Sequence, residues 1–246
     1  MEQKNHYRKS ARENKYLVFL ALLYLLAIVT SLTLSPRLFI LHVPFTDYSV
    51  PMPGGLYIFP FSYFLGDVIT EVYGYARARQ IVWFTVFASL LYILSTQSVI
   101  KLPPPSFYQD VAAYNTVFEP LPRFFGGVLM ALLVGSFIND YLMSRLKIYF
   151  KGRYLWARAV GSTIIGETIV AFLGTTIAWA GTLNFQTQIL PQIIVLVIFN
   201  ILYELVLSPF IYVSATMLKK AEGIDVYDYR INYNPFSLRL NESEEE

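Results

Sequence analysis

Residues 59–75 read FPFSYFLGDVITEVYGY. This segment is apolar enough for a membrane-spanning helix, yet it carries two carboxylates, Asp67 and Glu71. They lie one helical turn apart, so both side chains project from the same face. An ionisable group inside a membrane span costs about 2.5–3.5 kcal/mol on insertion scales, so it commonly marks a binding site or a polar pathway. The alternative is a buried structural pair that locks two helices together.

The composition of the whole chain is typical of a membrane protein. Of its 246 residues, 55% are hydrophobic and 15% are charged, and the mean hydropathy is +0.47. Six apolar stretches are long enough to cross about 30 Å of hydrocarbon, and because they are continuously apolar they favour helices over a barrel. They are 17–35, 54–74, 80–100, 122–145, 155–181 and 189–218. We expect an all-α integral membrane bundle of six transmembrane helices, with the second helix broken or kinked near Pro60.

The distribution of basic residues predicts the orientation. Sixteen of the nineteen Lys and Arg residues fall in the N-terminal tail, in the second and fourth connections and in the C-terminal tail, and the opposite side keeps Arg37, Lys101 and Arg123. Under the positive-inside rule both termini are cytoplasmic. This divides the chain into an N-terminal tail (1–16), a six-helix transmembrane domain (17–218) and a C-terminal tail (219–246). We expect the first apolar run to be a retained helix, since no small-residue cleavage pattern follows it.

Two segments outside the spans have their own signals. The connection 36–53 is dense in proline and ends at a Gly-Gly pair, so we expect a turn-rich or re-entrant segment. Residues 241–246 are rich in glutamate, which predicts a solvated tail.

Enzyme chemistry is poorly supported by the sequence. The chain has no cysteine, and its two histidines, His6 and His42, lie outside the predicted spans. No His/Cys metal set, zinc-protease motif or nucleotide-binding loop is present in the sequence. We therefore expect no catalytic residues, no metal, no cofactor and no direct nucleic-acid partner.

Polar residues inside the predicted spans form a short set of candidate site residues. The carboxylates should face the bundle interior, because lipid cannot solvate them. The candidate substrate-binding residues are Tyr63, Asp67, Glu71, Asn139, Ser162, Glu167, Asn200 and Glu204. Two arginines near opposite ends of their spans, Arg123 and Arg158, are the candidate charge-pairing or gating residues. Asp140 lies near a basic connection and is interpreted as a surface salt-bridge residue.

Each candidate also has a purely structural interpretation. Burial disfavours the charged form of a carboxyl, so Glu204 could be a protonated hydrogen-bond donor between helices. Ser162 could be a small residue that lets two helices approach. Arg158 could anchor its helix at the headgroups. The sequence leaves these alternatives open.

Aromatic residues accompany the acids. Tyr63, Phe64, Tyr73 and Tyr203 lie near them in the sequence, within a chain that has 19 Tyr and 19 Phe. Stacking on aromatic rings is worth about 1–3 kcal/mol per base in nucleic-acid systems. A guanine-like edge presents adjacent N–H donors that one carboxylate can accept in a bidentate way. An acidic and aromatic pocket is therefore compatible with a flat heterocycle.

Several separated motifs in order identify a family resemblance. They are FPxxYxxGDxxxExYGY (59–75), WxRxxGSTxxGE (156–167), YExxxSP (203–209), EGxDVYD (222–228) and NYNPF (232–236). On these motifs the chain resembles the queuosine-precursor transporter family, six-helix bacterial membrane proteins grouped with vitamin-uptake transporters. The resemblance covers nearly the whole chain. One departure is Asn200, because family members often carry a lysine about one turn before the glutamate that matches Glu204.

The resemblance implies a function in the bacterial plasma membrane. It implies import of a 7-deazaguanine, such as the 7-cyano or 7-aminomethyl compound, for making queuosine in tRNA. The expected pocket lies between the second, fourth, fifth and sixth helices. One rival is the substrate-capture subunit of an ATP-driven vitamin-type importer, and another is an intramembrane scaffold with structural acids. A homodimer and a coupling ion, either proton or sodium, are left open as partners beside the substrate and the bilayer.

Overall fold

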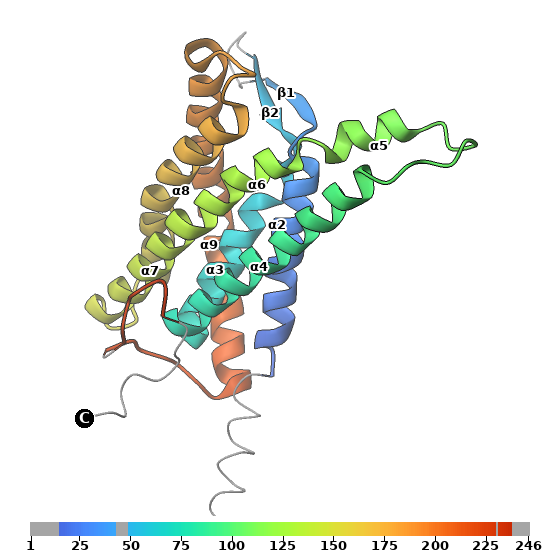
Figure 1. The fold of residues 1–246 in the computed structure, drawn as a ribbon. Helices are drawn as coiled ribbons and strands as arrows, with labels where there is room; N and C mark the ends of the chain where they lie inside the picture. The colour runs from blue at the N-terminus through green and yellow to red at the C-terminus, as the bar shows by residue number, and fades with distance from the viewer. Residues whose placement is uncertain (1–14, 43–48, 230, 238–246) are drawn as a thin grey trace, which may run out of the picture.

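The computed structural model describes residues 15–42, 49–229 and 231–237, and it shows a bundle of long helices with a small two-stranded sheet at one end (Figure 1). The predicted solvated tail, 241–246, lies outside the described residues. The α-helices are α2 (Leu17–Leu34), α3 (Phe59–Tyr73), α4 (Tyr75–Ile100), α5 (Val111–Phe118), α6 (Leu121–Met130), α7 (Phe137–Tyr149), α8 (Leu155–Trp179) and α9 (Leu190–Glu222). A π-helical segment, η2 (Ala131–Ser136), joins α6 to α7, and another, η3 (Phe185–Ile189), precedes α9.

The helices confirm a multi-pass membrane protein of the all-α class. Within the described residues, five helical stretches are long and apolar enough to cross a bilayer: Leu17–Leu34, Tyr75–Ile100, Val111–Tyr149, Leu155–Trp179 and Phe185–Glu222. Helix α3, with 15 residues, extends only about 22 Å at 1.5 Å per residue, which is shorter than the hydrocarbon core. The count of six spans and the cytoplasmic side of the termini stay predictions.

The segment before α3 differs from the prediction. Residues expected to be turn-rich or re-entrant pair instead as an antiparallel hairpin of β1 (Leu38–His42) and β2 (Ser49–Pro53), followed by a 3-10 turn, η1 (Gly54–Tyr57). Helix α3 then begins at Phe59, so Pro60 lies in its first turn, where a missing N–H breaks no helical hydrogen bond. The predicted break or kink of a longer helix near Pro60 is therefore not confirmed.

Helix α3 is the central element of the bundle. Eleven of its fifteen residues are buried, and it packs against α2, α4, α7 and α9. The outer helices instead expose large apolar side chains such as Phe84, Phe87, Val206 and Phe210, as expected for surfaces that contact lipid. Because neighbouring helices cover α3, its polar residues face other helices.

Both described ends of the chain meet at the end of the bundle opposite the hairpin (Figure 1). The Glu222 carboxylate, at the last residue of α9, accepts hydrogen bonds from the backbone N–H groups of Lys15 and Tyr16 and from the Tyr73 hydroxyl. We refer to this end, which also holds Lys147, Arg158 and Lys219, as the basic end, and to the opposite end as the hairpin end.

Helices α6 and α8 approach closely at one glycine pair. A Cβ at Gly127 would lie 2.7 Å from the backbone oxygen of Gly174, whereas a Cβ at the neighbouring Gly126 would meet only Ile177, at an ordinary 3.5 Å. Small residues at such crossings let membrane helices pack backbone to backbone.

We expect Gly127→Ala to destabilise the bundle by about 1–3 kcal/mol, because the two backbones must separate to admit the methyl group. Gly126→Ala is the matched control, since it brings the same gain in helix propensity without the clash. The thermal unfolding midpoints of both variants in detergent check this. Equal midpoints would show that the close crossing tolerates a methyl group.

Candidate functional site

Six of the predicted site side chains come together in the middle of the bundle. They come from four helices, and they are Tyr63 and Asp67 on α3, Asn139 on α7, Glu167 on α8, and Asn200 and Glu204 on α9. All six are buried. Two carboxylates are each held by an amide: Asn139 Nδ2 donates to Asp67 Oδ1 at 2.8 Å, and Asn200 Nδ2 donates to Glu167 Oε2 at 2.6 Å.

Glu204 connects the two amide–carboxylate pairs. It lies within interaction distance of both Asp67 and Glu167, and the Tyr63 hydroxyl lies beside Glu167. We refer to Asp67, Glu167 and Glu204 as the acidic cluster. Their side chains are 0–1% exposed. Among the described residues, none of the three forms an ion pair. Asp67 Oδ2, Glu167 Oε1 and Glu204 Oε1 have no partner within the distance and angle limits of a hydrogen bond, and their neighbours at slightly looser geometry are the Tyr63 hydroxyl for Glu167 and each other for Asp67 and Glu204. A buried polar atom without a partner is costly, so these oxygens are suited to bind a donor.

A pocket of about 100 Å³ connects this cluster with the hairpin end. Glu167 and Asn200 line it deep in the bundle, and Ser35, Pro53 and Gly55 line it near the hairpin. Its aromatic lining consists of Phe59, Phe124 and Trp179, with the last two rings perpendicular at 5.0 Å. The volume is below the roughly 300–1,000 Å³ of drug-sized ligand sites, so it favours a small occupant.

A second cavity of about 20 Å³ lies on the other side of α3. That volume is enough for about one water molecule. Its polar lining includes Asp140 and also Asn139 and Tyr63, of which Asn139 donates to Asp67 and Tyr63 lies beside Glu167.

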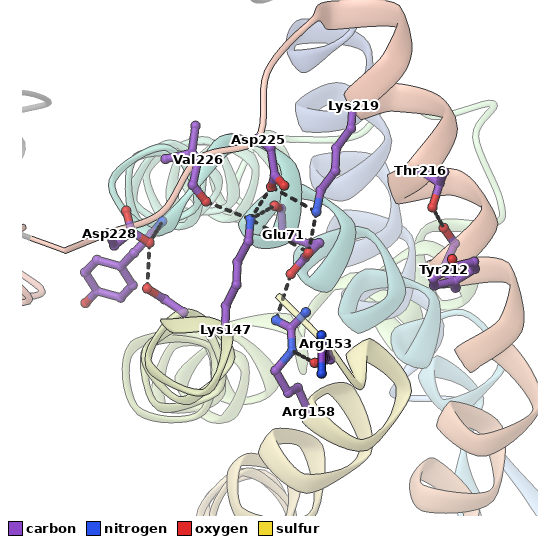
Figure 2. A network of polar contacts seen from close by, with 12 residues as sticks. Glu71, Lys147, Arg153, Arg158, Tyr212, Thr216, Lys219, Asp225, Val226 and Asp228 are labelled. Carbon is purple, nitrogen blue, oxygen red and sulfur yellow. Dashed lines mark hydrogen bonds and ion pairs between the residues drawn. The ribbon is translucent and has the colours of Figure 1, made fainter. Parts of the chain in front are cut away.

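Glu71 is separate from the acidic cluster, although it lies one turn from Asp67 on α3. Its Oε2 pairs with Arg158 Nη1 at 2.8 Å and its Oε1 with Lys219 Nζ at 2.5 Å (Figure 2). Lys147 Nζ lies 3.7 Å from Oε1 and donates to the Glu71 backbone oxygen at 2.6 Å. Glu71 is therefore fully engaged by cations, and its surroundings match the structural lock that the sequence left open.

Asp225 extends this network at the basic end. It pairs with Lys147 at 2.7 Å and with Lys219 at 2.9 Å. Partial burial works to raise the pKa of the Asp225 carboxyl, but hydrogen bonds from the two lysines outweigh it and hold that pKa below its usual value. We refer to Glu71, Lys147, Arg158, Lys219 and Asp225 as the charged lock.

The remaining predicted site residues lie outside the acidic cluster. Arg123 donates to the backbone oxygen of Ala180, just beyond the end of α8 on the hairpin side. Arg158, expected as a counter-charge, pairs with Glu71 and is completely buried, so it does not lie at the headgroups. Ser162 is buried and its hydroxyl donates to the Ala159 carbonyl of its own helix at 2.9 Å.

The interpretation of Asp140 as a surface salt-bridge residue is wrong. Asp140 is 3% exposed, accepts a hydrogen bond from Thr70 Oγ1 at 2.8 Å and lies within electrostatic range of Asp67. The physical reason is the orientation of α7, which turns this face toward α3. The adjacent Asn139–Asp140 pair, two strongly polar residues in one apolar helix, was a usable signal.

Other residues of the charged lock and of the pocket were also missed from the sequence. Lys147 and Lys219 were counted only as topology markers, yet they hold Glu71. Phe124 and Trp179 line the pocket but lie far from any acid in the sequence. Tyr73, expected beside the acids, bonds instead to Glu222 at the basic end.

Comparisons with known proteins agree with the membrane architecture. Residues 53–214 match a family model described as putative vitamin uptake transporter. A protein of Bacillus subtilis (strain 168) named probable queuosine precursor transporter is 33% identical over 122 residues. That alignment covers 48% of this chain and 52% of the relative, so the chain spans about half the length of the curated relative it matches. No solved structure matches the chain.

Proposed function

This chain belongs to the putative vitamin uptake transporter family, and on that premise we propose that it imports a small, flat nitrogen heterocycle across the bacterial inner membrane. The name of the Bacillus relative indicates the substrate class, a queuosine precursor. We propose a 7-deazaguanine, such as the 7-cyano or 7-aminomethyl compound. The proposal needs no cofactor and no catalytic residue.

The observation that carries this proposal is the chemistry at the deep end of the pocket. Glu167 Oε1 is buried without a partner, while Asn200 holds Oε2 and so fixes the carboxylate. The ring edge of a deazaguanine presents adjacent N–H donors, and hydrogen bonds to a charged acceptor contribute about 1.5–3 kcal/mol each. The aromatic residues Phe59, Phe124 and Trp179 suit the faces of the ring.

We assign roles by position in the bundle. Glu167 and Asn200 make the first polar contacts with a ligand that enters from the hairpin end, and Asp67, Asn139, Glu204 and Tyr63 complete the site. A carboxyl of the Asp67–Glu204 pair is our candidate carrier of a coupling proton, with sodium as the alternative ion. Glu71 and Arg158 act in the charged lock and close the basic end.

The structure favours this proposal over a scaffold with purely structural acids. In a scaffold each buried carboxyl should have its own partner, as Glu71 has. The acidic cluster instead keeps unpaired oxygens, and one of them belongs to Glu167, which lines the pocket. The ATP-driven rival keeps the same pocket and changes only the energy source. Transport by the purified chain in liposomes without a partner ATPase would exclude it.

The direct test is uptake in cells that lack both their own precursor transporter and precursor synthesis. With this chain expressed, we expect labelled 7-deazaguanine to enter and queuosine to appear in tRNA. Expression at the membrane without either signal, for both compounds, would refute the proposed function.

Binding alone should be visible as stabilisation of the purified protein. A ligand that binds only the folded state stabilises the folded protein by about 2.7 kcal/mol when its concentration is 100 times its Kd. The unfolding midpoint should therefore rise with ligand concentration. Adenine, which presents a different edge to the carboxylate, is the control and should leave the midpoint unchanged. Equal shifts with adenine would point to non-specific stacking.

A further inference from the structure

We infer that the ligand of this site carries a positive charge beside its ring, so that the 7-aminomethyl compound is preferred over the 7-cyano compound. This inference rests on the proposed function. It follows from the charge balance of the acidic cluster and from the hydrogen-bonding group of each compound, an ammonium donor in one and a nitrile acceptor in the other.

The partners of the acidic cluster are neutral. Asn139 and Asn200 each donate one N–H to a carboxylate but bring no charge. The cation that acts on Asp67 electrostatically is Arg158, whose Nη1 already pairs with Glu71 at 2.8 Å. Among the described residues, no Lys or Arg forms an ion pair with Asp67, Glu167 or Glu204. The site therefore lacks the cation that a buried carboxylate normally requires.

A charged ligand can supply what the protein does not. An ammonium group brings a positive charge and three donors to oxygens that are otherwise unpaired, and charge-assisted hydrogen bonds are the strong ones. A nitrile nitrogen is only an acceptor. Placed among carboxylate oxygens it meets no donor and adds acceptor–acceptor repulsion, so the 7-cyano compound gains only from its ring edge.

The experiment measures the affinities of both compounds for the purified full-length protein by calorimetry. We expect the 7-aminomethyl compound to bind at least about tenfold more tightly than the 7-cyano compound. Glu167→Gln should lower the affinity for both compounds, because both present the same ring edge to this carboxylate. It should lower the affinity for the amine by about tenfold more than that for the nitrile, so that most of the preference is lost. Glu204→Gln repeats the test if the first variant does not fold, and Glu119→Gln, at an exposed position, is the control.

The outcomes separate the inference from the function on which it rests. If both compounds bind equally, or the nitrile binds more tightly, the inference is overturned and the importer proposal stands. If neither binds, both are overturned. An unchanged preference in folded Glu167→Gln and Glu204→Gln would show that these carboxylates do not select the charge.

A second inference rests on different residues: we propose that the segment after α9, residues 224–229 and 231–237, is a latch across the basic end that lifts when ligand leaves. This segment, the C-terminal latch, has no helix or strand. It runs across the ends of helices α3, α4, α7 and α9. Polar contacts hold it at each step described below, and the rings of Tyr233 and Phe236 also pack against Tyr75 and Trp83 of α4.

The first part of the C-terminal latch is held by the charged lock. Lys147 Nζ donates to Asp225 Oδ1 and to the Val226 backbone oxygen, both at 2.7 Å, and Lys219 pairs with the same carboxylate (Figure 2). The Asp225 side chain is 44% exposed, whereas Glu71 on the same lysines is 1% exposed. Asp225 is therefore the member of the charged lock that water can reach and replace.

The next part of the C-terminal latch is hydrogen-bonded to the first turns of α4 and to Ser144 of α7. Asp228 Oδ2 accepts the backbone N–H of Tyr75 at 3.0 Å and the Ser144 hydroxyl at 2.5 Å. Arg79 Nη1 then donates to the backbone oxygens of Asn232 at 2.7 Å and Asn234 at 2.8 Å. Trp83 Nε1 donates to the Pro235 backbone oxygen at 2.7 Å.

The same helices carry both the lock and the ligand site. The charged lock joins α3, α7, α8 and α9, which also supply Asp67, Asn139, Glu167 and Glu204. The pocket extends to the hairpin end, so the basic end is the closed side in this structure. Release of ligand there requires these helix ends to separate, and they cannot separate while the C-terminal latch spans them.

The chain has no cysteine, so a single introduced thiol reports on the latch. Ser144 lies under it and is 3% exposed. In purified Ser144→Cys protein we expect thiol labelling to accelerate several-fold when Asp225→Asn is added, and also when the transported ligand is added. The first comparison needs no ligand and therefore holds even if the proposed function fails. Unchanged labelling in both comparisons would overturn the latch.

A cross-link tests whether the movement is required. In Ser144→Cys with Asp228→Cys, a reversible thiol cross-linker should abolish uptake while ligand binding persists, and reduction should restore it. Uptake that continues through the cross-linked protein would also overturn the latch. If the reduced double variant is itself inactive, the labelling experiment decides.

Discussion

Replacing Glu71 with Gln is expected to destabilise the folded protein by about 3–5 kcal/mol, the range found when one partner of a buried ion pair is removed. The reason is what the change leaves behind. Arg158 is completely buried and would lose the carboxylate 2.8 Å away, while Lys147, itself 3% exposed, would lose one of its two carboxylate partners. Glutamine keeps the shape of the side chain, so the loss reports on charge rather than on packing.

The measurement is thermal unfolding of the purified variant in detergent, with Asp225→Asn as the internal comparison. Both changes remove one carboxylate that contacts the same lysines. Since Asp225 is 44% exposed, its loss should cost no more than about 1 kcal/mol. If Glu71→Gln unfolds at the temperature of the unaltered protein, the buried pair contributes nothing and the charged lock is not a structural element.

The spacing of Asp67 and Glu71 predicts that they share a helical face, and they do lie on one buried helix. It does not predict that one carboxylate is paired with cations and the other with an amide. The difference comes from α7, α8 and α9, which bring Lys147, Arg158 and Lys219 to one level of α3 and Asn139 to the next. Such contacts are long-range, and a local pattern contains no information on them.

Charge counting predicts an orientation in the membrane, but it does not predict the role of each charge. Lys147 lies in the last turn of α7, where a basic side chain usually extends to water, and it does lie at the basic end of the bundle. Its ammonium group instead turns inward because Glu71, Asp225 and two backbone oxygens all accept from it or attract it. The same limit explains Asp140, whose neighbours in sequence are basic but whose neighbours in space are Thr70 and Asp67.

The hairpin was missed for a different reason. Its strands read LFILH and SVPMP, without the alternation of polar and apolar residues that marks a half-buried strand. Two prolines, Pro51 and Pro53, lie in the second strand, and proline argues against a central strand but is tolerated at an edge. In a two-stranded sheet both strands are edges, so the breaker residues and the pairing are compatible.

Helix α3 links the acidic cluster to the charged lock over one turn, about 6 Å along its axis. In the transport cycle that we propose, a ligand cation that attracts Asp67 therefore acts on the same rigid element as Glu71. We propose α3 as the mechanical link between ligand binding at one level and release of the basic end at the next. A stiff buried helix transmits such a shift better than a loop, since it has few alternative conformations.

Glu167→Gln is expected to reduce uptake by about 10- to 100-fold, the effect of losing one or two hydrogen bonds to a charged acceptor. The amide keeps the size of the side chain and the contact with Asn200. It replaces one acceptor oxygen with an NH2 donor and removes the negative charge at the deep end of the pocket. Initial uptake rates in cells with matched amounts of protein at the membrane give the measurement, and Glu119→Gln is the control because it removes an equal charge from an exposed position.

The dependence on ligand concentration then distinguishes the two roles open to Glu167. If its carboxylate binds the ligand, the half-saturating concentration rises and the loss is partly recovered at high ligand. If it carries the coupling proton, binding survives, the maximal rate falls at every concentration, and the pH dependence of uptake flattens. Glu204→Gln provides the second case for comparison, since Glu204 lies behind the pocket and beside Asp67. Full uptake by both variants would remove the acidic cluster from transport, because no protonation or pairing scheme gives these two carboxylates a role that an amide performs equally well.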